Sequence, residues 1–83
     1  MTRVLLTRRF EKNFKKLDGK TKARIKDVVL SLKDEPDQGK SLTGELAGEY
    51  SLRVGTYRIL YIIQGDDLIV ETVRHRRDVY KRR

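Results

Sequence analysis

Two glycine-centred turns constrain the fold most, because they divide the second half of the chain into three short apolar segments. Gly55-Thr56 and Gly65-Asp66 separate the segments at residues 50–54, 57–63 and 68–73. The first segment alternates apolar with polar residues, which is the period of a strand. Glycine at the first central position of a two-residue loop is typical of a type II′ hairpin turn. The sequence therefore predicts a three-stranded antiparallel meander.

The first half of the chain has the period of helices instead. Residues 3–6 predict a short edge strand, and Thr7 has the side chain of a helix N-cap. Phe10, Phe14 and Leu17 then recur at i, i+4 and i+7, the spacing of one helical face. We expect Asp18-Gly19 to end this helix.

A second helix is expected from about Thr21, and Pro36 is expected to end it. Its apolar face consists of Ile25, Val28, Val29 and Leu32. The short connection predicts an antiparallel helix hairpin, and residues 37–48 predict a loop. The fold class is α+β, in a single domain over residues 1–83. It combines an N-terminal strand, a helix hairpin, and a meander forming one sheet with the helices on one face, followed by a basic C-terminal tail.

The first turn fixes a register for the meander. A loop at Gly55-Thr56 pairs Arg53 with Arg58, and paired residues in an antiparallel ladder share a face. The opposite face, which should receive the helices, then carries Tyr50, Leu52, Val54, Tyr57, Ile59 and Tyr61. Two facing arginines repel each other, but they would also clamp a phosphate between two guanidinium forks. The alternative is that both side chains simply splay into solvent.

The second turn extends this register to the last strand. A loop at Gly65-Asp66 places Val73 opposite Arg58, and it places Glu71 opposite Leu60 and Ile69 opposite Ile62. By alternation, His75 is then expected on the face of Arg53 and Arg58. Leu60, Ile62 and Ile69 should form an apolar patch on that face, which a partner helix or the protein's own tail would cover.

A formal net charge of +8 on 83 residues favours a polyanionic partner, either nucleic acid or an acidic protein, over a merely well-solvated surface. The chain has no cysteine and no apolar run near the ~20 residues of a membrane span. We therefore expect a soluble, cytoplasmic protein that does not bind membranes.

The basic tail at residues 74–83 contains His75, the only histidine, and Tyr80. Histidine exchanges protons readily near neutral pH, and a tyrosine ring offers a surface on which a base can stack. A disordered basic arm with non-specific affinity for polyanions is the simpler interpretation of the same residues.

Residues 50–61, with the pattern LRVGxYRxxY, together with the HRRxVY pattern at residues 75–80, resemble the RelE toxin family of the RelE/ParE superfamily. The order of elements agrees along essentially the whole chain. The resemblance implies a type II toxin that enters the ribosomal A site and cuts mRNA by attack of the 2′-OH, without a metal or other cofactor. It also implies a 70S-type ribosome and mRNA as partners and a RelB-like antitoxin, with a toxin–antitoxin heterotetramer as one assembly.

The resemblance also implies roles for individual residues. Arg58 matches the phosphate-binding arginine of the family, and Arg53 matches a basic residue on the preceding strand. Tyr80 matches the tyrosine that packs on the nucleotide, and Arg76, or alternatively Arg74, matches the arginine near the leaving group. Further RNA contacts are expected from Arg74, Arg77 and Lys81.

The chain departs from the family pattern at Ser51 and Arg53, where well-known members have lysines. Arginine is a poor general base. The base is then His75, or catalysis rests on electrostatic stabilisation and positioning. Two alternatives stay open: a ParE-like, non-enzymatic inhibitor of DNA gyrase, and a basic domain that has lost its activity.

Overall fold

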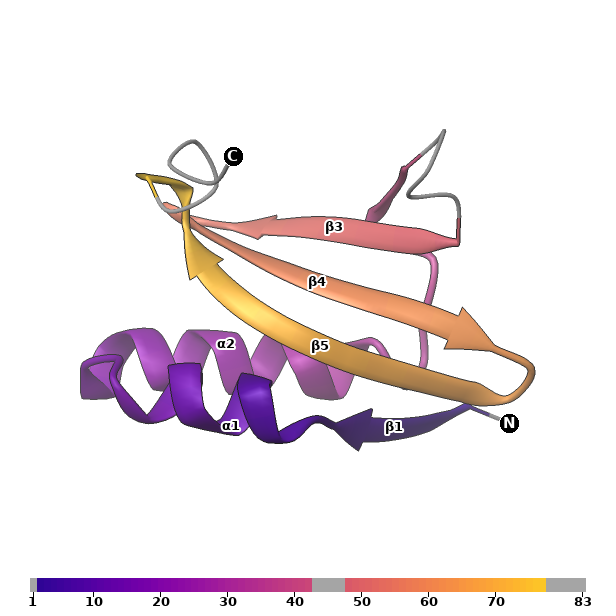
Figure 1. Cartoon of the computed structure of the whole chain (residues 1–83), viewed down its shortest axis with the longest axis horizontal. Coiled ribbons are helices and arrows are strands. Elements are labelled where there is room, and N and C mark those ends of the chain that lie inside the picture. Colours follow the sequence, from indigo (N-terminus) through magenta and orange to yellow (C-terminus); the bar gives the residue numbers. More distant parts are fainter. Residues whose placement is uncertain (1, 43–47, 78–83) are drawn as a thin grey trace.

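The computed structural model describes residues 2–42 and 48–77, in which two helices lie against a strongly twisted sheet (Figure 1). In chain order the elements are β1 (Arg3–Leu6), α1 (Arg8–Lys15), α2 (Gly19–Ser31), β2 (Lys40–Ser41), β3 (Glu49–Val54), β4 (Tyr57–Gln64) and β5 (Asp67–His75). The five strands form one sheet in the order β1-β5-β4-β3-β2. β1 runs parallel to β5, and all other pairs are antiparallel. The predicted α+β class, edge strand and meander are confirmed.

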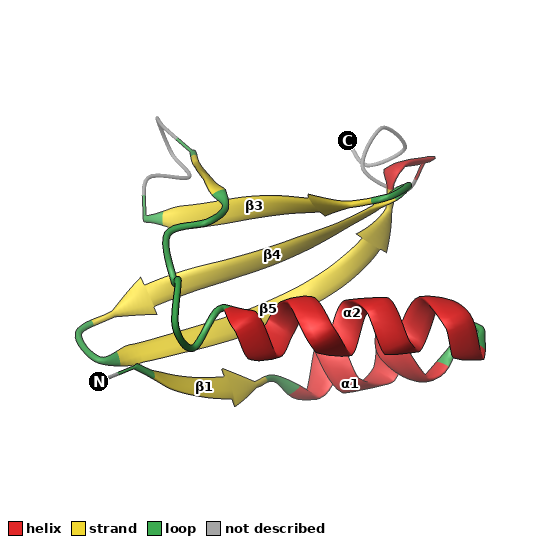
Figure 2. Cartoon of the chain, turned by 180° about the vertical axis from the view of Figure 1, so that it is seen from behind, coloured by secondary structure: helices red, strands yellow, loops and turns green. Residues whose placement is uncertain are grey.

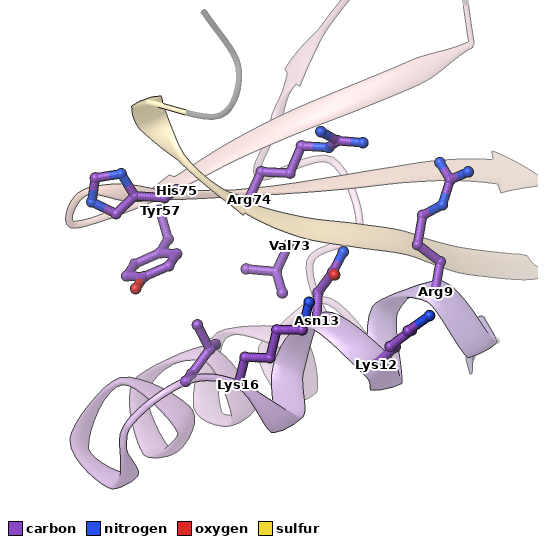
Figure 3. A pocket seen from close by; sticks show the side chains of 9 residues that line it. Arg9, Lys12, Asn13, Lys16, Tyr57, Val73, Arg74 and His75 are labelled. Carbon is purple, nitrogen blue, oxygen red and sulfur yellow. The ribbon is translucent and has the colours of Figure 1, made fainter. Parts of the chain in front are cut away.

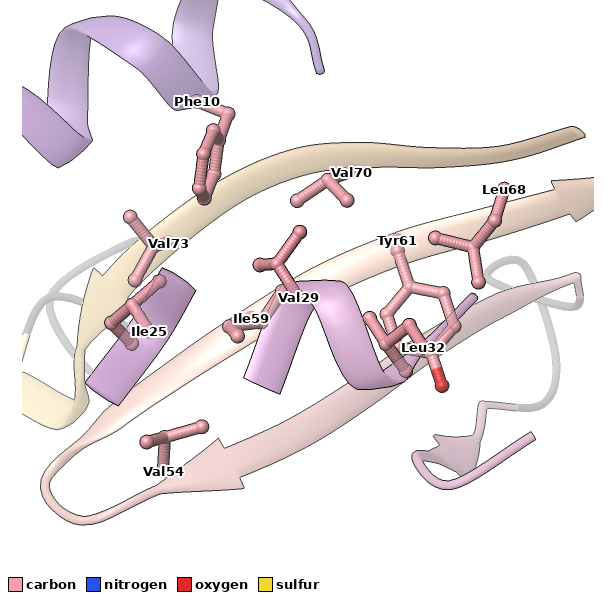
Figure 4. Packing of buried hydrophobic residues seen from close by; sticks show 10 residues of the cluster. All are labelled: Phe10, Ile25, Val29, Leu32, Val54, Ile59, Tyr61, Leu68, Val70 and Val73. Carbon is pink, nitrogen blue, oxygen red and sulfur yellow. The ribbon is translucent and has the colours of Figure 1, made fainter. Parts of the chain in front are cut away.

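Both helices lie on the same side of the sheet, as predicted (Figure 2). The core between the two layers contains three buried helix residues, Phe10, Ile25 and Val29, and the buried C-cap of α2, Leu32. Six buried sheet residues complete it: Val54, Ile59, Tyr61, Leu68, Val70 and Val73 (Figure 4). Tyr50, Leu52 and Tyr57 are partly buried against this cluster. The predicted helix-facing side of β3 and β4 is therefore confirmed residue by residue.

The two tight turns have the geometry that the sequence indicated. Gly55 has a φ of 63° and Gly65 a φ of 61°, and no described residue other than glycine has a positive φ. A positive φ at the first central position followed by a negative one is the sign pattern of a type II′ turn. Each turn therefore joins its two strands through a loop of only two residues.

The helix boundaries differ from the predictions in two places. Thr7 is the N-cap of α1, as predicted, and its Oγ1 accepts a hydrogen bond from the Phe10 amide at 3.1 Å. Asp18 does not end α1 but begins α2, because its carboxylate accepts from the Thr21 amide at 2.7 Å and this hydrogen bond lowers the pKa of Asp18. α2 ends at Ser31, five residues before Pro36, where the chain enters a series of tight turns.

The segment predicted as a loop at residues 37–48 contains a short strand, β2, that pairs with β3. Tyr61 explains how this segment is held. The phenol of Tyr61 donates to the Pro36 carbonyl and accepts from the Gly39 amide, both at 2.9 Å. A buried side chain of β4 thus anchors the backbone that leads into β2.

The register is the feature that positions the functional residues. Between β3 and β4 it is the predicted one, with Arg53 opposite Arg58. Between β4 and β5 it follows the prediction as far as Tyr61 opposite Val70 and then shifts by one residue at a bulge that leaves Glu71 unpaired. The predicted pairs of Arg58 with Val73 and of Leu60 with Glu71 are therefore wrong. Arg74 pairs with Arg58, and Thr72 pairs with Leu60.

Candidate functional site

Three arginines lie in a row across neighbouring strands, on the face of the sheet that the helices do not cover. Arg53 on β3 pairs with Arg58 on β4, and Arg58 pairs with Arg74 on β5. Neighbouring strands are about 4.8 Å apart, so each guanidinium is within reach of the next. We call Arg53, Arg58 and Arg74 the arginine row.

No carboxylate neutralises the arginine row within residues 2–42 and 48–77. The one ion pair in this part of the chain joins Arg3 to Asp67, with 2.9 Å between Nε and Oδ1. Like charges directly opposite each other in a sheet are destabilising by a few tenths of a kcal/mol to about 1 kcal/mol per pair. Three adjacent arginines therefore lower the stability of the isolated protein. Guanidinium groups, however, bind phosphate or carboxylate oxygens in a bidentate fashion. The row therefore has the charge and the spacing to bind an anion.

Beside the arginine row, the same face carries an apolar strip. Ile62 on β4 pairs with Ile69 on β5, and Leu5 on β1 pairs with Ile69 from the other side. Leu60 lies two residues before Ile62 on β4, on the same face. These side chains are half-buried or, for Leu5, 39% exposed. Both described helices lie on the other side of the sheet (Figure 2), so neither helix covers this face. The predicted apolar patch is therefore present, and we call Leu5, Leu60, Ile62 and Ile69 the apolar strip.

His75 does not join the arginine row. The bulge at Glu71 turns it to the opposite face, where it pairs with Tyr57 and meets its ring edge-on at a centroid distance of 5.1 Å. The expectation that His75 shares a face with Arg53 and Arg58 is wrong for this reason. Its Nδ1 accepts a hydrogen bond from the Arg77 amide at 3.2 Å, so a neutral ring carries its proton on Nε2.

The start of the tail is fixed next to the first hairpin turn. The Arg76 amide donates to the carbonyl of Thr56 at 2.8 Å. Arg76 and Arg77 are both exposed, so their guanidinium groups are free to contact a ligand at this end of the sheet. Tyr80 and Lys81, the other two predicted site residues of the tail, lie outside the described residues.

Glu71, the bulge residue, has a raised pKa. Burial raises its pKa and the neighbouring Glu49 raises it further, while Arg9 on α1 acts in the opposite direction. The Thr7 hydroxyl donates to the Glu71 carbonyl at 2.7 Å and so holds the bulge against the start of α1. The bulge is thus tied to a residue 64 positions away in the sequence, which explains why no local signal revealed it.

Neither described helix is long and apolar enough to cross a lipid bilayer.

Comparisons with known proteins place the chain among bacterial and archaeal toxins. A family model described as the ParE toxin of the type II toxin–antitoxin system parDE matches residues 4–80. Toxin RelE3 of Methanocaldococcus jannaschii is 33% identical over 84 aligned residues, which cover 94% of each protein. Toxin RelG of Mycobacterium tuberculosis is 50% identical over 46 residues, and this match spans about half of RelG, 53% of its length.

Solved structures share the fold along nearly the whole chain. A chain in the toxin–antitoxin complex RelBE2 from M. tuberculosis superimposes with a TM-score of 0.82 and 33% identity, over 89% of this protein and 96% of that chain. A chain in the RelB–RelE antitoxin–toxin complex from Methanococcus jannaschii gives a TM-score of 0.75 and 26% identity, over 92% and 94%.

Proposed function

The chain belongs to the ParE toxin family of type II toxin–antitoxin systems, within the RelE/ParE superfamily, and from this membership we propose that it is an endoribonuclease that cuts mRNA in the ribosomal A site. The observation that carries the proposal is the arginine row. Its three cations lie side by side on an uncovered face and have no carboxylate partner among the described residues. The similarity to two toxins with RelE-type names, RelE3 and RelG, also supports the endoribonuclease proposal.

The arginine row suits the charge that develops when RNA is cleaved through its own 2′-OH. The 2′-OH loses its proton to solvent water as its oxygen bonds to the adjacent phosphorus. The bond to the 5′ oxygen breaks, that oxygen takes a proton from water, and the phosphoryl oxygens gain negative charge in between. Arg58, at the centre of the row, donates to these oxygens, and Arg53 and Arg74 add charge from either side. Groups that are already oriented toward developing charge lower a barrier without reorganising.

The chain's own residues favour electrostatic stabilisation and positioning over a dedicated general base. Arginine is a poor general base, so we do not assign the 2′-OH proton to Arg53. His75 lies on the opposite face, with Nδ1 occupied by the Arg77 amide. The Thr56 carbonyl accepts a hydrogen bond from the Arg76 amide and so anchors the backbone of Arg76. We propose that the Arg76 guanidinium stabilises the negative charge on the departing 5′ oxygen. Tyr80 is assigned to stacking on the nucleotide.

The partners follow from the same assignment. mRNA on a 70S-type ribosome is the substrate, and a RelB-like antitoxin is the inhibitor. Solved relatives from M. tuberculosis, M. jannaschii and Pyrococcus horikoshii are toxin complexes with RelB-type proteins. The apolar strip offers such an antitoxin a surface directly beside the arginine row, so one bound segment would cover both.

The test is a reconstituted translation reaction with a triple variant, R53A/R58A/R74A. A matched control, K15A/K26A/K33A, removes the same number of charges from exposed positions on the helices and the turn after α2. We expect the wild-type protein and the control to cleave ribosome-bound mRNA and the triple variant to lose cleavage while keeping its circular dichroism spectrum. Cleavage by the triple variant at the control's rate would refute the assignment.

A ParE-like action on DNA gyrase is the second candidate, because the matching family model carries the ParE name. A supercoiling assay in parallel with the translation assay separates the two. Inhibition of supercoiling without any mRNA cleavage would replace the endoribonuclease proposal with this one.

A further inference from the structure

A second basic surface lies on the other side of β5 from the arginine row. An open hollow of about 560 Å³ separates α1 from the end of β5, and its lining includes Arg9, Lys12 and Lys16 (Figure 3). Tyr57 and His75 line its far end. No aspartate or glutamate is among its lining residues, so the arginine and lysine side chains of the lining are not offset by an acidic residue of the lining.

The cations of α1 point into the hollow because of their spacing. Arg9, Lys12 and Lys16 follow each other at i, i+3 and i+7 and therefore form one narrow stripe on the helix. Glu11, the one acidic residue of α1, lies on the opposite side of the helix. Like charges at this spacing destabilise a helix by about 0.2–0.5 kcal/mol per pair. The stripe thus brings no stability to the isolated fold.

The hollow has rigid walls. The Asn13 side chain, within the same stripe, donates to the Thr72 hydroxyl at 2.6 Å and fixes α1 against β5. On the other wall, the Tyr57 ring is held edge-on to His75. Proteins bind single-stranded nucleic acid with such a pairing of an aromatic surface and nearby cations, through base stacking and phosphate contacts.

Arg74 connects this hollow to the arginine row. It belongs to the row by its pairing with Arg58, and it also lines the hollow. Figure 3 shows its side chain on the other side of β5 from the buried Val73. β1 pairs with β5 only as far as Val70. Beyond Val70, the edge of β5 has no β-strand partner among the described residues.

From these observations we propose that the hollow between α1 and β5 binds a second nucleotide of single-stranded RNA, next to the one held by the arginine row. Lys12 and Lys16 contact its phosphate, and Tyr57 offers its ring to the base. The inference rests on RNA as the ligand of the arginine row, that is, on the proposed function. Net positive charge alone would spread affinity over all basic residues, whereas this proposal concentrates it on two lysines.

The test compares two double charge reversals with equal change in net charge. K12E/K16E alters the hollow, and K26E/K33E alters exposed lysines that do not line it. The probe is a fluorescent oligoribonucleotide of about 12 nucleotides, the scale of a single-strand site, and anisotropy gives its affinity for each purified protein. We expect K12E/K16E to bind about tenfold more weakly than K26E/K33E and to show a shallower dependence on salt.

Three outcomes decide the matter. Equal affinities for the two variants, with both still folded by circular dichroism, would overturn the proposal even if the arginine-row variant had lost mRNA cleavage. If the wild-type protein does not cleave mRNA but K12E/K16E loses RNA binding, the result would support RNA binding in the hollow and reject the proposed function. Loss of antitoxin binding by K12E/K16E with unchanged RNA binding would assign the hollow to a protein partner and overturn the proposal.

Discussion

Arg58 is the residue on which the candidate site depends most, because it is the only member of the arginine row with an arginine on each side. Its value lies in the planar guanidinium as much as in the charge, since a fork of donors can hold two phosphoryl oxygens at once. A lysine at this position would keep the charge but contact one oxygen at a time.

We therefore expect Arg58→Lys to lose mRNA cleavage by a factor on the order of 10², close to the loss in Arg58→Ala. Arg8→Lys, at an exposed position of α1, is the matched control and should cleave at the wild-type rate. The measurement is the rate of cleavage of ribosome-bound mRNA under single-turnover conditions. A fully active Arg58→Lys variant would show that a point charge suffices and that bidentate contact is not used.

Among the secondary-structure elements, the first hairpin was predictable from the sequence in full and the second only in part. Gly55-Thr56 fixes the register of β3 with β4, so the Arg53–Arg58 pair follows from counting residues. The same counting fails after Val70, because a bulge at Glu71 shifts the register, and the contact made there by the Glu71 carbonyl is with the distant Thr7. Distant contacts of this kind leave no trace in local periodicity, and His75 was consequently assigned to the wrong face.

Removing the Tyr61 hydroxyl tests whether this side chain of β4 stabilises the connection before β2. Tyr61→Phe removes the donor to Pro36 and the acceptor for Gly39, and it leaves two backbone groups without their partner. We expect a loss of about 1–3 kcal/mol in the free energy of unfolding, measured by urea denaturation. Tyr50→Phe, at the neighbouring stacked ring, is the control and should change stability less.

Tyr61 also makes the free energy of unfolding depend on pH. Burial raises the pKa of Tyr61 above its ordinary value near 10, so the folded state favours the neutral phenol. Its contribution to stability is fully present below about pH 10 and is lost as the pH rises through the folded-state pKa. Denaturation at increasing alkaline pH should show a steeper loss for the wild type than for Tyr61→Phe. Parallel slopes would mean that Tyr61 ionises as easily in the folded protein as in the unfolded chain.

For the molecule as a whole, the two-layer arrangement leaves one face of the sheet uncovered by the helices. The α+β class, the placement of both helices on one face and the pairing of Arg53 with Arg58 all followed from hydrophobic periodicity and turn residues. The hollow beside α1 did not. The spacing of Arg9, Lys12 and Lys16 is visible in the sequence, but only the packing of α1 against β5 shows what the stripe faces.

The uncovered face also predicts how the antitoxin binds. If it covers the apolar strip, Ile62→Asp would bury an unpaired carboxylate at the interface, and we expect affinity for the cognate antitoxin to fall about 100-fold or more. Leu30→Asp, at a more exposed leucine on α2, is the control and should bind normally. Isothermal titration with both variants, checked for folding by circular dichroism, makes the comparison. Unchanged affinity of Ile62→Asp would place the antitoxin elsewhere.

Toeprinting of mRNA on programmed ribosomes tests the central claim most directly, because it reports both whether RNA is cut and where. With the wild-type protein we expect new 3′ ends confined to the codon in the A site, and none with R53A/R58A/R74A. Intact mRNA in the presence of folded wild-type protein would contradict the account, and so would cuts scattered equally over ribosome-free RNA.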